Sequence, residues 1–301
     1  MAYQESGATA VAQSLYPLVL LTPAAIHGAD PREKAEFRLP SLRGVWRYWW
    51  RTLQDEPNHE KLLAKEEEWF GGTRKTKQQS PVHLTLARAM EGTMRENILP
   101  HRTSPTFVPA LPAGGEVTVT LSVRKRHQER LAQYDWHFQY MLHLASFGQR
   151  SRRGFGAVQW TGHQWDNVEE YGESLRMTLE RIGAADAFSF AAHGRLVARR
   201  EDIATPHPVL SAVWVGEGKE SAAEVVKVFG RASHEANRYG SLGYMRGKEG
   251  KLSSPLWCTV RKIGGRYYPI VTEVRNHDSC YREPRYERDR NRFLEIVGVR
   301  I

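Results

Sequence analysis

Residues 41–53, SLRGVWRYWWRTL, place three tryptophans and three arginines within thirteen positions, and so restrict what this chain can fold into. Apolar residues fall at positions 42, 45, 46, 49, 50 and 53. This spacing predicts a helix over residues 42–53 with Ser41 as its N-cap. One face carries Trp46, Trp49 and Trp50, whose rings require a large core, while the arginines lie on a separate arc.

The elements predicted around this helix follow a recognisable order in the first half of the chain. Short or alternating apolar runs predict strands, and helical periodicity predicts helices. The strands are residues 14–21, 82–86, 117–123 and 157–161, and the helices are residues 42–53, 60–69 and 128–147. A proline-rich loop separates the second and third strands. The order predicts the ferredoxin-like βαββαβ plan, a four-stranded antiparallel sheet with helices on one face.

The second half of the sequence predicts a similar order. We expect strands at residues 209–215, 256–263, 267–274 and 294–299, and a helix at residues 220–237. A short echo accompanies this: Gly71 and Arg74 precede Ser80-Pro81, and Gly243 and Arg246 precede Ser254-Pro255. The matching element order and the short sequence echo both favour duplication of one domain within the chain.

The sequence therefore predicts an α+β fold of two ferredoxin-like (RRM-like, βαββαβ) domains with loop insertions. We expect the N-terminal domain at residues 1–165 and the C-terminal domain at residues 186–301. The linker is expected around residues 162–185, where the composition turns polar.

The charge balance points to an anionic partner. The 301-residue chain has 43 Lys and Arg against 34 Asp and Glu, a net charge of +9. Residues 101–160 alone hold eight basic and three acidic residues. Its two cysteines, Cys258 and Cys280, form no CxxC pair, which favours a reducing compartment over a disulfide scaffold. We expect a cytoplasmic protein, since neither a signal peptide nor an apolar run of about 20 residues is present.

Two basic segments are candidates for binding that partner. The first is on the predicted helix and contains Arg43, Arg47 and Arg51. Gly44 beside them leaves room for a backbone to approach. The second is the loop 149–156, QRSRRGFG, in which glycines expose main-chain N–H groups and guanidinium forks match phosphate oxygens. Solvated arginines on a surface helix or loop are the simpler alternative. Neither GxGxxG nor a P-loop motif is present, so a nucleotide-binding fold is not predicted.

These motifs, in this order, resemble the RAMP superfamily, and within it the first RAMP subunit of the Cmr complex, the type III-B CRISPR effector. The resemblance covers about the first 160 residues. It is carried by Gly28-Ala29-Asp30, by Arg38, Pro40, Ser41 and Gly44, by Arg47, Trp49, Trp50 and Arg51, by Trp69 to Thr73, and by Arg150 to Gly156. The second half agrees mainly by element order.

The resemblance implies a non-catalytic antiviral RNA-binding subunit that holds the 3′ part of the guide crRNA and helps capture target RNA. Its neighbours would be other RAMP subunits, with no membrane and no cofactor. Phosphate and 2′-hydroxyl contacts would hold the strand without reading its sequence. The predicted RNA-binding residues are Arg38, Arg43, Gly44, Arg47, Arg51, Arg150, Ser151, Arg152, Arg153, Gly154 and Gly156. In the proline-rich insertion, His101-Arg102 and Phe107 are candidates for stacking on bases.

A RAMP-type endoribonuclease acting on target or guide RNA is the alternative. His27 or Asp30 would then serve as the base at a 2′-hydroxyl, with Arg38 near the phosphate. Asp30 precedes Pro31, however, where a turn-forming role is common, and the resembled subunit is not the cutting one. A structural adaptor that meets an acidic protein is a third possibility.

No metal site is predicted. His277, Cys280 and Cys258 have irregular spacing and no fourth ligand, so buried thiols and a surface histidine are the simpler interpretation. The run Glu66-Glu67-Glu68, with Asp55 and Glu56, is interpreted as a solvated helix face rather than a Mg²⁺ site.

Overall fold

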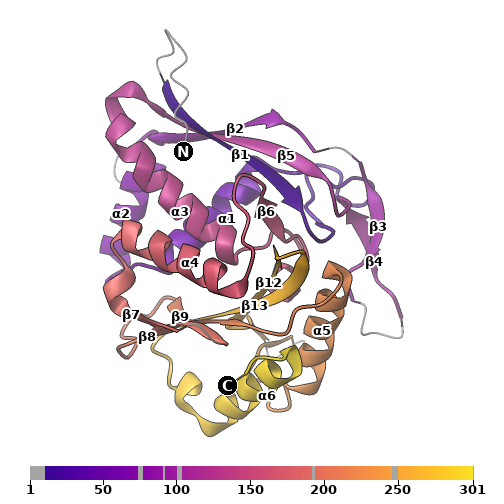
Figure 1. The fold of residues 1–301 in the computed structure, drawn as a ribbon. Helices are drawn as coiled ribbons and strands as arrows, with labels where there is room; N and C mark the ends of the chain where they lie inside the picture. Colours follow the sequence, from indigo (N-terminus) through magenta and orange to yellow (C-terminus); the bar gives the residue numbers. More distant parts are fainter. Residues whose placement is uncertain are drawn as a thin grey trace.

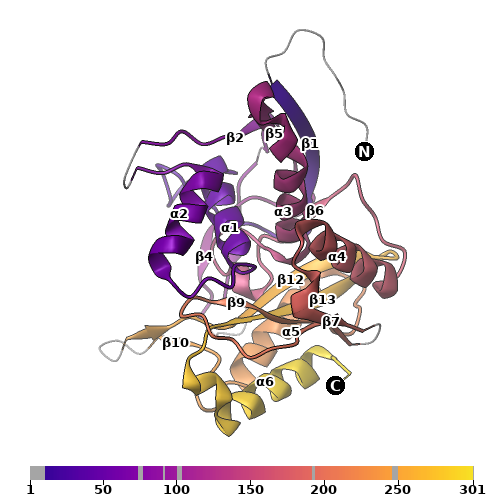
Figure 2. The ribbon, with the colours of Figure 1, turned by 90° about the vertical axis from the view of Figure 1, so that its left-hand side faces the viewer.

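The computed structural model describes residues 11–73, 77–90, 92–99, 104–191, 194–245 and 250–300. Helices and strands are both present in each half, and every paired strand in the sheets is antiparallel, so the fold is α+β. Figures 1 and 2 show four layers: an N-terminal sheet, the helices α1, α3 and α4, a C-terminal sheet, and the helices α5 and α6.

The first half contains the predicted order with an extra hairpin. Its elements are β1 (Val11–Leu20), α1 (Leu39–Arg51), α2 (His59–Phe70), β2 (Val82–Arg88), β3 (Met94–Asn97), β4 (Phe107–Ala110), β5 (Glu116–Arg124), α3 (Leu131–Leu144) and β6 (Val158–Trp160). Four of these strands form a sheet in the order β2-β5-β1-β6, and β3 pairs with β4 in a separate hairpin. The hairpin occupies the proline-rich insertion.

The start of α1 differs from the prediction. The helix begins at Leu39, with Arg38 at the N-cap, and Ser41 lies inside the first turn. Pro40 explains this difference, because its fixed φ suits the first helical turn and its missing N–H would have no partner there. The predicted apolar face is correct: Trp46, Trp49 and Trp50 are buried.

The second half contains α4 (Val168–Ile182), β7 (Phe188–Phe190), β8 (Arg195–Arg199), β9 (Val209–Val215), α5 (Ala222–Glu235), β10 (Tyr244–Met245), β11 (Lys251–Leu252), β12 (Leu256–Ile263), β13 (Arg266–Arg275) and α6 (Pro284–Val297). Its main sheet has the order β12-β13-β9-β8-β7. Strands β7 and β8 were not expected, and β8 pairs with β9 at the side away from β13.

Two predictions for this half are wrong. Residues 162–185 are not a polar linker, because α4 fills most of them and buries Tyr171, Leu175 and Leu179 one turn apart. Residues 294–299 are not a closing strand. They fall largely in α6, where Phe293, Leu294 and Val297 form a buried helical face, and Gly298 ends the helix with a left-handed backbone.

The sequence echo between the halves has a structural counterpart. Gly71 has φ +77°, and a Cβ built on it would lie 2.6 Å from the backbone N of Ser80. Gly243 has φ +102°, and its Cβ would lie 2.8 Å from the backbone N of Ser254. Both glycines therefore allow the same close approach of the chain just before a strand. Arg74 and Arg246, the other members of the echo, lie outside the described residues.

The two halves share a core. The buried cluster around Trp46 and Trp49 continues through Phe138 on α3 to Trp257 and Ile270 of the second sheet. No helix in the described part of the chain is long and apolar enough to span a membrane.

One buried cation also joins the halves. The guanidinium of Arg261 on β12 donates to the carbonyl oxygens of His143, at 3.0 Å, and Ala145, at 3.0 Å, at the C-terminus of α3. Carbonyls at a helix C-terminus carry partial negative charge, so they suit a buried guanidinium. Burial lowers the pKa of Arg261 to about 10.

Candidate nucleic-acid interface

The arginine face of α1 is held against α2. Arg43 donates to the carbonyl oxygen of Phe70 and to the hydroxyl of Ser80. These acceptors are uncharged, so the positive charge of Arg43 is not neutralised. Burial, followed by repulsion from Arg47, lowers the pKa of the Arg43 guanidinium. Gly44, next to it, is exposed, and a Cβ there would meet nothing within 4 Å.

Arg47 and Arg51 share one buried carboxylate, that of Glu66 on α2. Arg47 Nε lies 2.6 Å from Glu66 Oε1, and Arg51 Nη1 lies 3.5 Å from Oε2. The Glu66 side chain is 4% exposed, whereas those of Arg47 and Arg51 are 33% and 42% exposed. The prediction that Glu66 belongs to a solvated face is therefore wrong: it is a buried acid that needs cations beside it. Two arginines share one acid, so a net positive charge remains at the surface.

The glycine-rich loop is packed between the two halves of the molecule. Residues Ser151–Arg153 form a short 3-10 helix, preceded by Arg150 with φ 58°. The backbone N–H of Gly154 donates to the Cys258 carbonyl at 3.1 Å. Gly156 has φ +69°, and a Cβ there would lie 1.9 Å from the Phe147 carbonyl oxygen. The glycines of this loop thus permit tight backbone packing. The sequence had instead predicted that they expose main-chain N–H groups to an anion.

The arginines of this loop reach β12. Arg153 donates to the carbonyl oxygens of Arg152, at 2.8 Å, and Leu256, at 3.3 Å. Arg152 donates to the carbonyl oxygen of Ser254. Burial lowers the pKa of both Arg152 and Arg153. These carbonyl acceptors are neutral, so among the described residues no acid cancels their charge.

One arginine of α1, Arg51, and one of the loop, Arg152, lie near Tyr48 and Trp257. Arg152 Cζ lies 4.4 Å from the centroid of the Trp257 ring, and Trp257 Nε1 donates to the Tyr48 hydroxyl at 3.0 Å. Burial raises the pKa of Tyr48, while the Arg152 cation, the Trp257 hydrogen bond and the Arg51 cation oppose this. We call Tyr48, Arg51, Arg152 and Trp257 the interdomain cationic cluster.

Sequence reasoning missed the aromatic half of this cluster. Tyr48 follows Arg47 in the sequence, and its place on the arginine side of the helical wheel was the available signal. Nothing in the sequence pairs Trp257 with Arg152, because their contact depends on how the second sheet packs beneath α1.

The loop around His27 lies beside the glycine-rich loop. His27 Nε2 lies 2.8 Å from the Pro109 carbonyl oxygen, and His27 Nδ1 lies 3.4 Å from Gln149 Nε2. Arg38 donates to the His27 carbonyl at 3.0 Å and lies 3.3 Å from Glu36. Both ring nitrogens of His27 are therefore engaged. A role as general base would first require Gln149 to move.

Asp30 is exposed, and its carbonyl oxygen accepts from the Lys34 N–H at 3.1 Å. This hydrogen bond closes a turn, which agrees with the position of Asp30 before Pro31. Phe107, predicted to stack on bases, is 52% exposed at the start of β4. His101 and Arg102 lie outside the described residues.

The described residues contain no group of three or more His, Cys, Asp and Glu side chains that could hold a metal ion. Cys258 is buried and Cys280 is half-buried. Burial raises the pKa of the Cys258 thiol to about 12.

Comparison with known proteins gives this geometry a context. The RAMP superfamily model matches residues 18–159, which include the end of β1, the arginine helix and the glycine-rich loop. The chain thus resembles the RAMP superfamily over just under half of its length. A curated relative is the CRISPR system Cmr subunit Cmr1-1 of Pyrococcus furiosus, 24% identical over 276 residues, which cover 79% of this chain and 80% of that protein.

Solved structures share the fold over both halves. The crystal structure of Cmr1 from Pyrococcus furiosus, in its apo form, matches with a TM-score of 0.60 and 21% identity, covering 88% of each chain. A chain of the type III-B Cmr-beta complex bound to cognate target RNA matches with a TM-score of 0.59 and 10% identity, covering 96% of this chain and 100% of that one. The similarity in fold to these two structures therefore includes the residues beyond 159.

Proposed function

We propose that this chain is a non-catalytic RNA-binding subunit of a type III-B CRISPR (Cmr) effector complex. It holds the 3′ part of the guide crRNA, helps capture target RNA, and contacts other RAMP subunits in the cytoplasm. The similarity to Cmr1 and to a chain of the target-bound Cmr-beta complex supports this assignment.

One observation carries the RNA-binding part of the proposal. Arg152 from the glycine-rich loop lies over the Trp257 ring, which donates to the Tyr48 hydroxyl on α1, and the Arg152 and Arg51 cations both oppose the rise in the pKa of Tyr48. Guanidinium groups bind phosphate through parallel N–H donors, and a tyrosine hydroxyl suits a 2′-hydroxyl or a phosphate oxygen. Such contacts position a strand and leave its bases free for pairing.

We also propose a two-domain organisation for the subunit. The order β2-β5-β1-β6, with its antiparallel pairs, supports a ferredoxin-like domain within residues 1–165. In the second domain, residues 186–301, β9, α5, β12, β13 and α6 follow the same plan, and β8 takes the place beside β9 that a closing strand would occupy. The matching Gly71 and Gly243 geometry supports duplication.

Binding of single-stranded guide RNA, measured by fluorescence anisotropy over a range of salt concentrations, tests the proposal. Arg51→Gln should weaken binding several-fold and lower the salt slope by roughly 0.7, the value for one phosphate contact on a single strand. Arg47 remains to neutralise Glu66, so the fold should persist. Arg176→Gln is the matched control, because Arg176 is neutralised by Glu173 and Glu180 on α4. Equal effects of the two variants would contradict the proposal.

The same samples test the endoribonuclease alternative. We expect labelled RNA to remain full-length on a denaturing gel. Cleavage that is lost in both Asp30→Ala and His27→Ala would instead establish the alternative.

A further inference from the structure

Strand β1 has one open edge. Strand β6 pairs with it only at Leu18–Leu20, and the Thr161 N–H then donates to the Pro17 carbonyl at 2.9 Å. Before Pro17, no described strand pairs with this side of β1. Residues 11–16 thus leave an edge of roughly 20 Å unpaired, at about 3.4 Å per residue.

The register of β1 identifies which backbone groups face this edge. The pairing with β5 runs from Val11 to Val19 without a bulge, so backbone groups alternate between the two sides. The Pro17 carbonyl points to the β6 side and the Leu20 N–H points to the β5 side. By this alternation, the N–H and C=O groups of Gln13 and Leu15 point to the open edge. Within the described part of the chain, neither residue has a backbone hydrogen-bond partner on that side.

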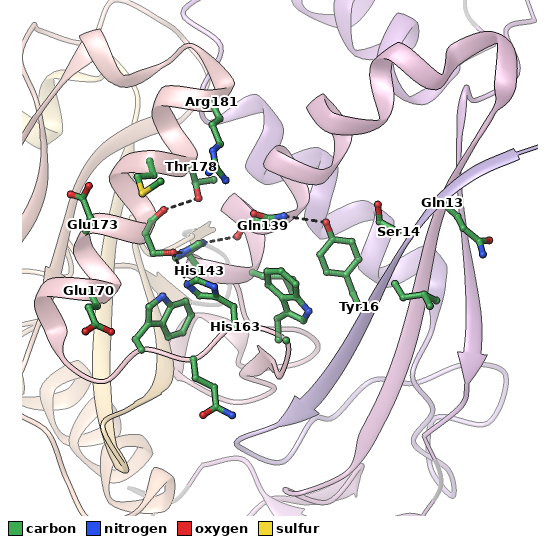
Figure 3. A pocket seen from close by; sticks show the side chains of 18 residues that line it. Gln13, Ser14, Tyr16, Gln139, His143, His163, Glu170, Glu173, Thr178 and Arg181 are labelled. Carbon is green, nitrogen blue, oxygen red and sulfur yellow. Dashed lines mark hydrogen bonds between the residues drawn. The ribbon is translucent and has the colours of Figure 1, made fainter. Parts of the chain in front are cut away.

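A cavity of about 810 Å³ lies along this edge. Gln13 and Leu15 line it from one face of β1, and Ser14 and Tyr16 line it from the other, so the cavity extends around the strand edge. Figure 3 shows the helix α4 and the segment carrying His163 on the opposite side. Leu15 is 48% exposed, which is unusual for a large apolar side chain at a strand edge.

The walls of the cavity suit a peptide better than a nucleic acid. Trp160, Trp165 and Met177 provide apolar surface, and Gln139 and Ser174 provide neutral hydrogen-bonding groups. The ionised side chains are Glu170, Glu173 and Arg181, two acids against one base. Burial lowers the pKa of His143 to about 3, and burial lowers the pKa of His163, so neither imidazole adds positive charge near neutral pH. This lining contrasts with the net +9 of the chain, and its one arginine is outnumbered by two acids, which disfavours a phosphate backbone.

We propose that the open edge of β1 binds an extended segment of a neighbouring protein subunit as an added β-strand, with an apolar side chain in the cavity beside Trp160 and Met177. This mode supplies main-chain hydrogen bonds for affinity and a side-chain pocket for specificity. It also explains how an unpaired edge is protected from non-specific pairing. The inference rests on the proposed membership of an effector complex, and it adds a protein-binding site distinct from the interdomain cationic cluster.

Hydrogen–deuterium exchange of the full chain, alone and within the assembled effector complex, tests this. The Gln13 and Leu15 amides should exchange quickly in the isolated chain and at least roughly tenfold more slowly in the complex, since each gains a hydrogen bond. Leu15→Pro should reduce affinity for the complex roughly tenfold by removing the edge N–H. A proline at position 15 should be compatible with the strand, because β1 already contains Pro17, whose backbone faces the same side as that of Leu15. Leu15→Ala, the matched control, keeps the N–H and should lose less affinity than Leu15→Pro.

Five outcomes would overturn the inference. Protection already present in the isolated chain would mean that the edge is covered by the chain itself. Protection on adding guide RNA alone would identify nucleic acid as the occupant. Unprotected amides in an assembled complex, or unchanged assembly of Leu15→Pro, would remove this site while leaving the proposed function intact. A chain that does not join the complex would overturn both.

Discussion

Arg152 Cζ lies 4.4 Å from the centroid of the Trp257 ring, although the two residues are more than 100 positions apart in the sequence. The guanidinium also donates to the Ser254 carbonyl, so it fastens the glycine-rich loop of the first half to β12 of the second. Because that acceptor is neutral, one side chain joins the halves and still contributes a positive charge. We therefore expect a structural role and the proposed RNA-binding role to coincide in Arg152.

Replacing Arg152 by lysine separates these roles. Lysine keeps the charge but lacks the planar group that lies over Trp257, so we expect the free energy of unfolding to fall by about 1 kcal/mol. The salt slope of RNA binding should change little, whereas Arg152→Gln should lower it. Urea unfolding followed by tryptophan fluorescence measures the first effect. Arg292→Lys, an exposed pair with Glu295, is the control and should leave both quantities unchanged.

Glu66→Gln should have opposite effects on stability and RNA binding. Loss of the carboxylate leaves Arg47 and Arg51 without a charged partner, so unfolding should become easier by roughly 1–3 kcal/mol. The same change frees one positive charge, so RNA should bind more tightly at low salt. Glu68→Gln serves as the comparison, since Glu68 is exposed and pairs with Arg130. Weaker RNA binding by folded Glu66→Gln would count against the α1 arginines as RNA contacts.

Gly44→Ala tests whether a backbone approaches the arginine helix. Gly44 lies within α1 and a Cβ there meets open space, so alanine should stabilise the protein by up to about 1 kcal/mol. If RNA lies close to Gly44, the added methyl group should weaken RNA binding while stability rises. Thermal unfolding and anisotropy on the same sample measure both. RNA affinity equal to that of the unaltered protein would remove Gly44 from the interface.

Acid should destabilise the fold through buried histidines. Burial lowers the pKa of His137 to about 3, against about 6.5 in an unfolded chain. Between these values the unfolded chain binds a proton that the folded chain does not, so stability falls as the pH drops from about 6.5 towards 3, by about 1.4 kcal/mol per pH unit. His137→Phe, which preserves the ring contact with Trp69, should make this decline shallower.

Urea unfolding at a series of pH values measures that slope. His143, whose pKa burial also lowers to about 3, continues to contribute, so the slope should decrease rather than vanish. His59→Phe is the control, because His59 is exposed at the start of α2. An unchanged slope in His137→Phe would contradict a buried neutral His137.

The first half of the fold was predictable because its periodicity and its packing agree. Alternation in β5 and the tryptophan face of α1 both report which side meets the core, and each is a local pattern. The prediction of a strand at residues 294–299 failed because there the local pattern did not decide between two structures. Leu294 and Val297 fit a short buried strand or the last turn of a helix equally well, and burial against the second sheet made them helical.

The candidate site was also only partly predictable from the sequence. Arg43, Arg47, Arg51 and the arginines of the loop were identifiable as basic residues from the sequence. Their partners were not, because Glu66 looked like one acid in a solvated run. Likewise, nothing in the sequence around Trp257 indicated that its ring would contact Arg152.

The sequence by itself determined the positive charge, the arginine helix with its tryptophan face, and the order of the main helices and strands along the first half of the chain. These depend on composition and on contacts between near neighbours in the chain. Only the tertiary structure decided which cations are neutralised, that Tyr48 and Trp257 join Arg51 and Arg152, and that the edge of β1 stays open beside a cavity. Those properties depend on desolvation and on distances between residues far apart in the chain, which no local pattern encodes.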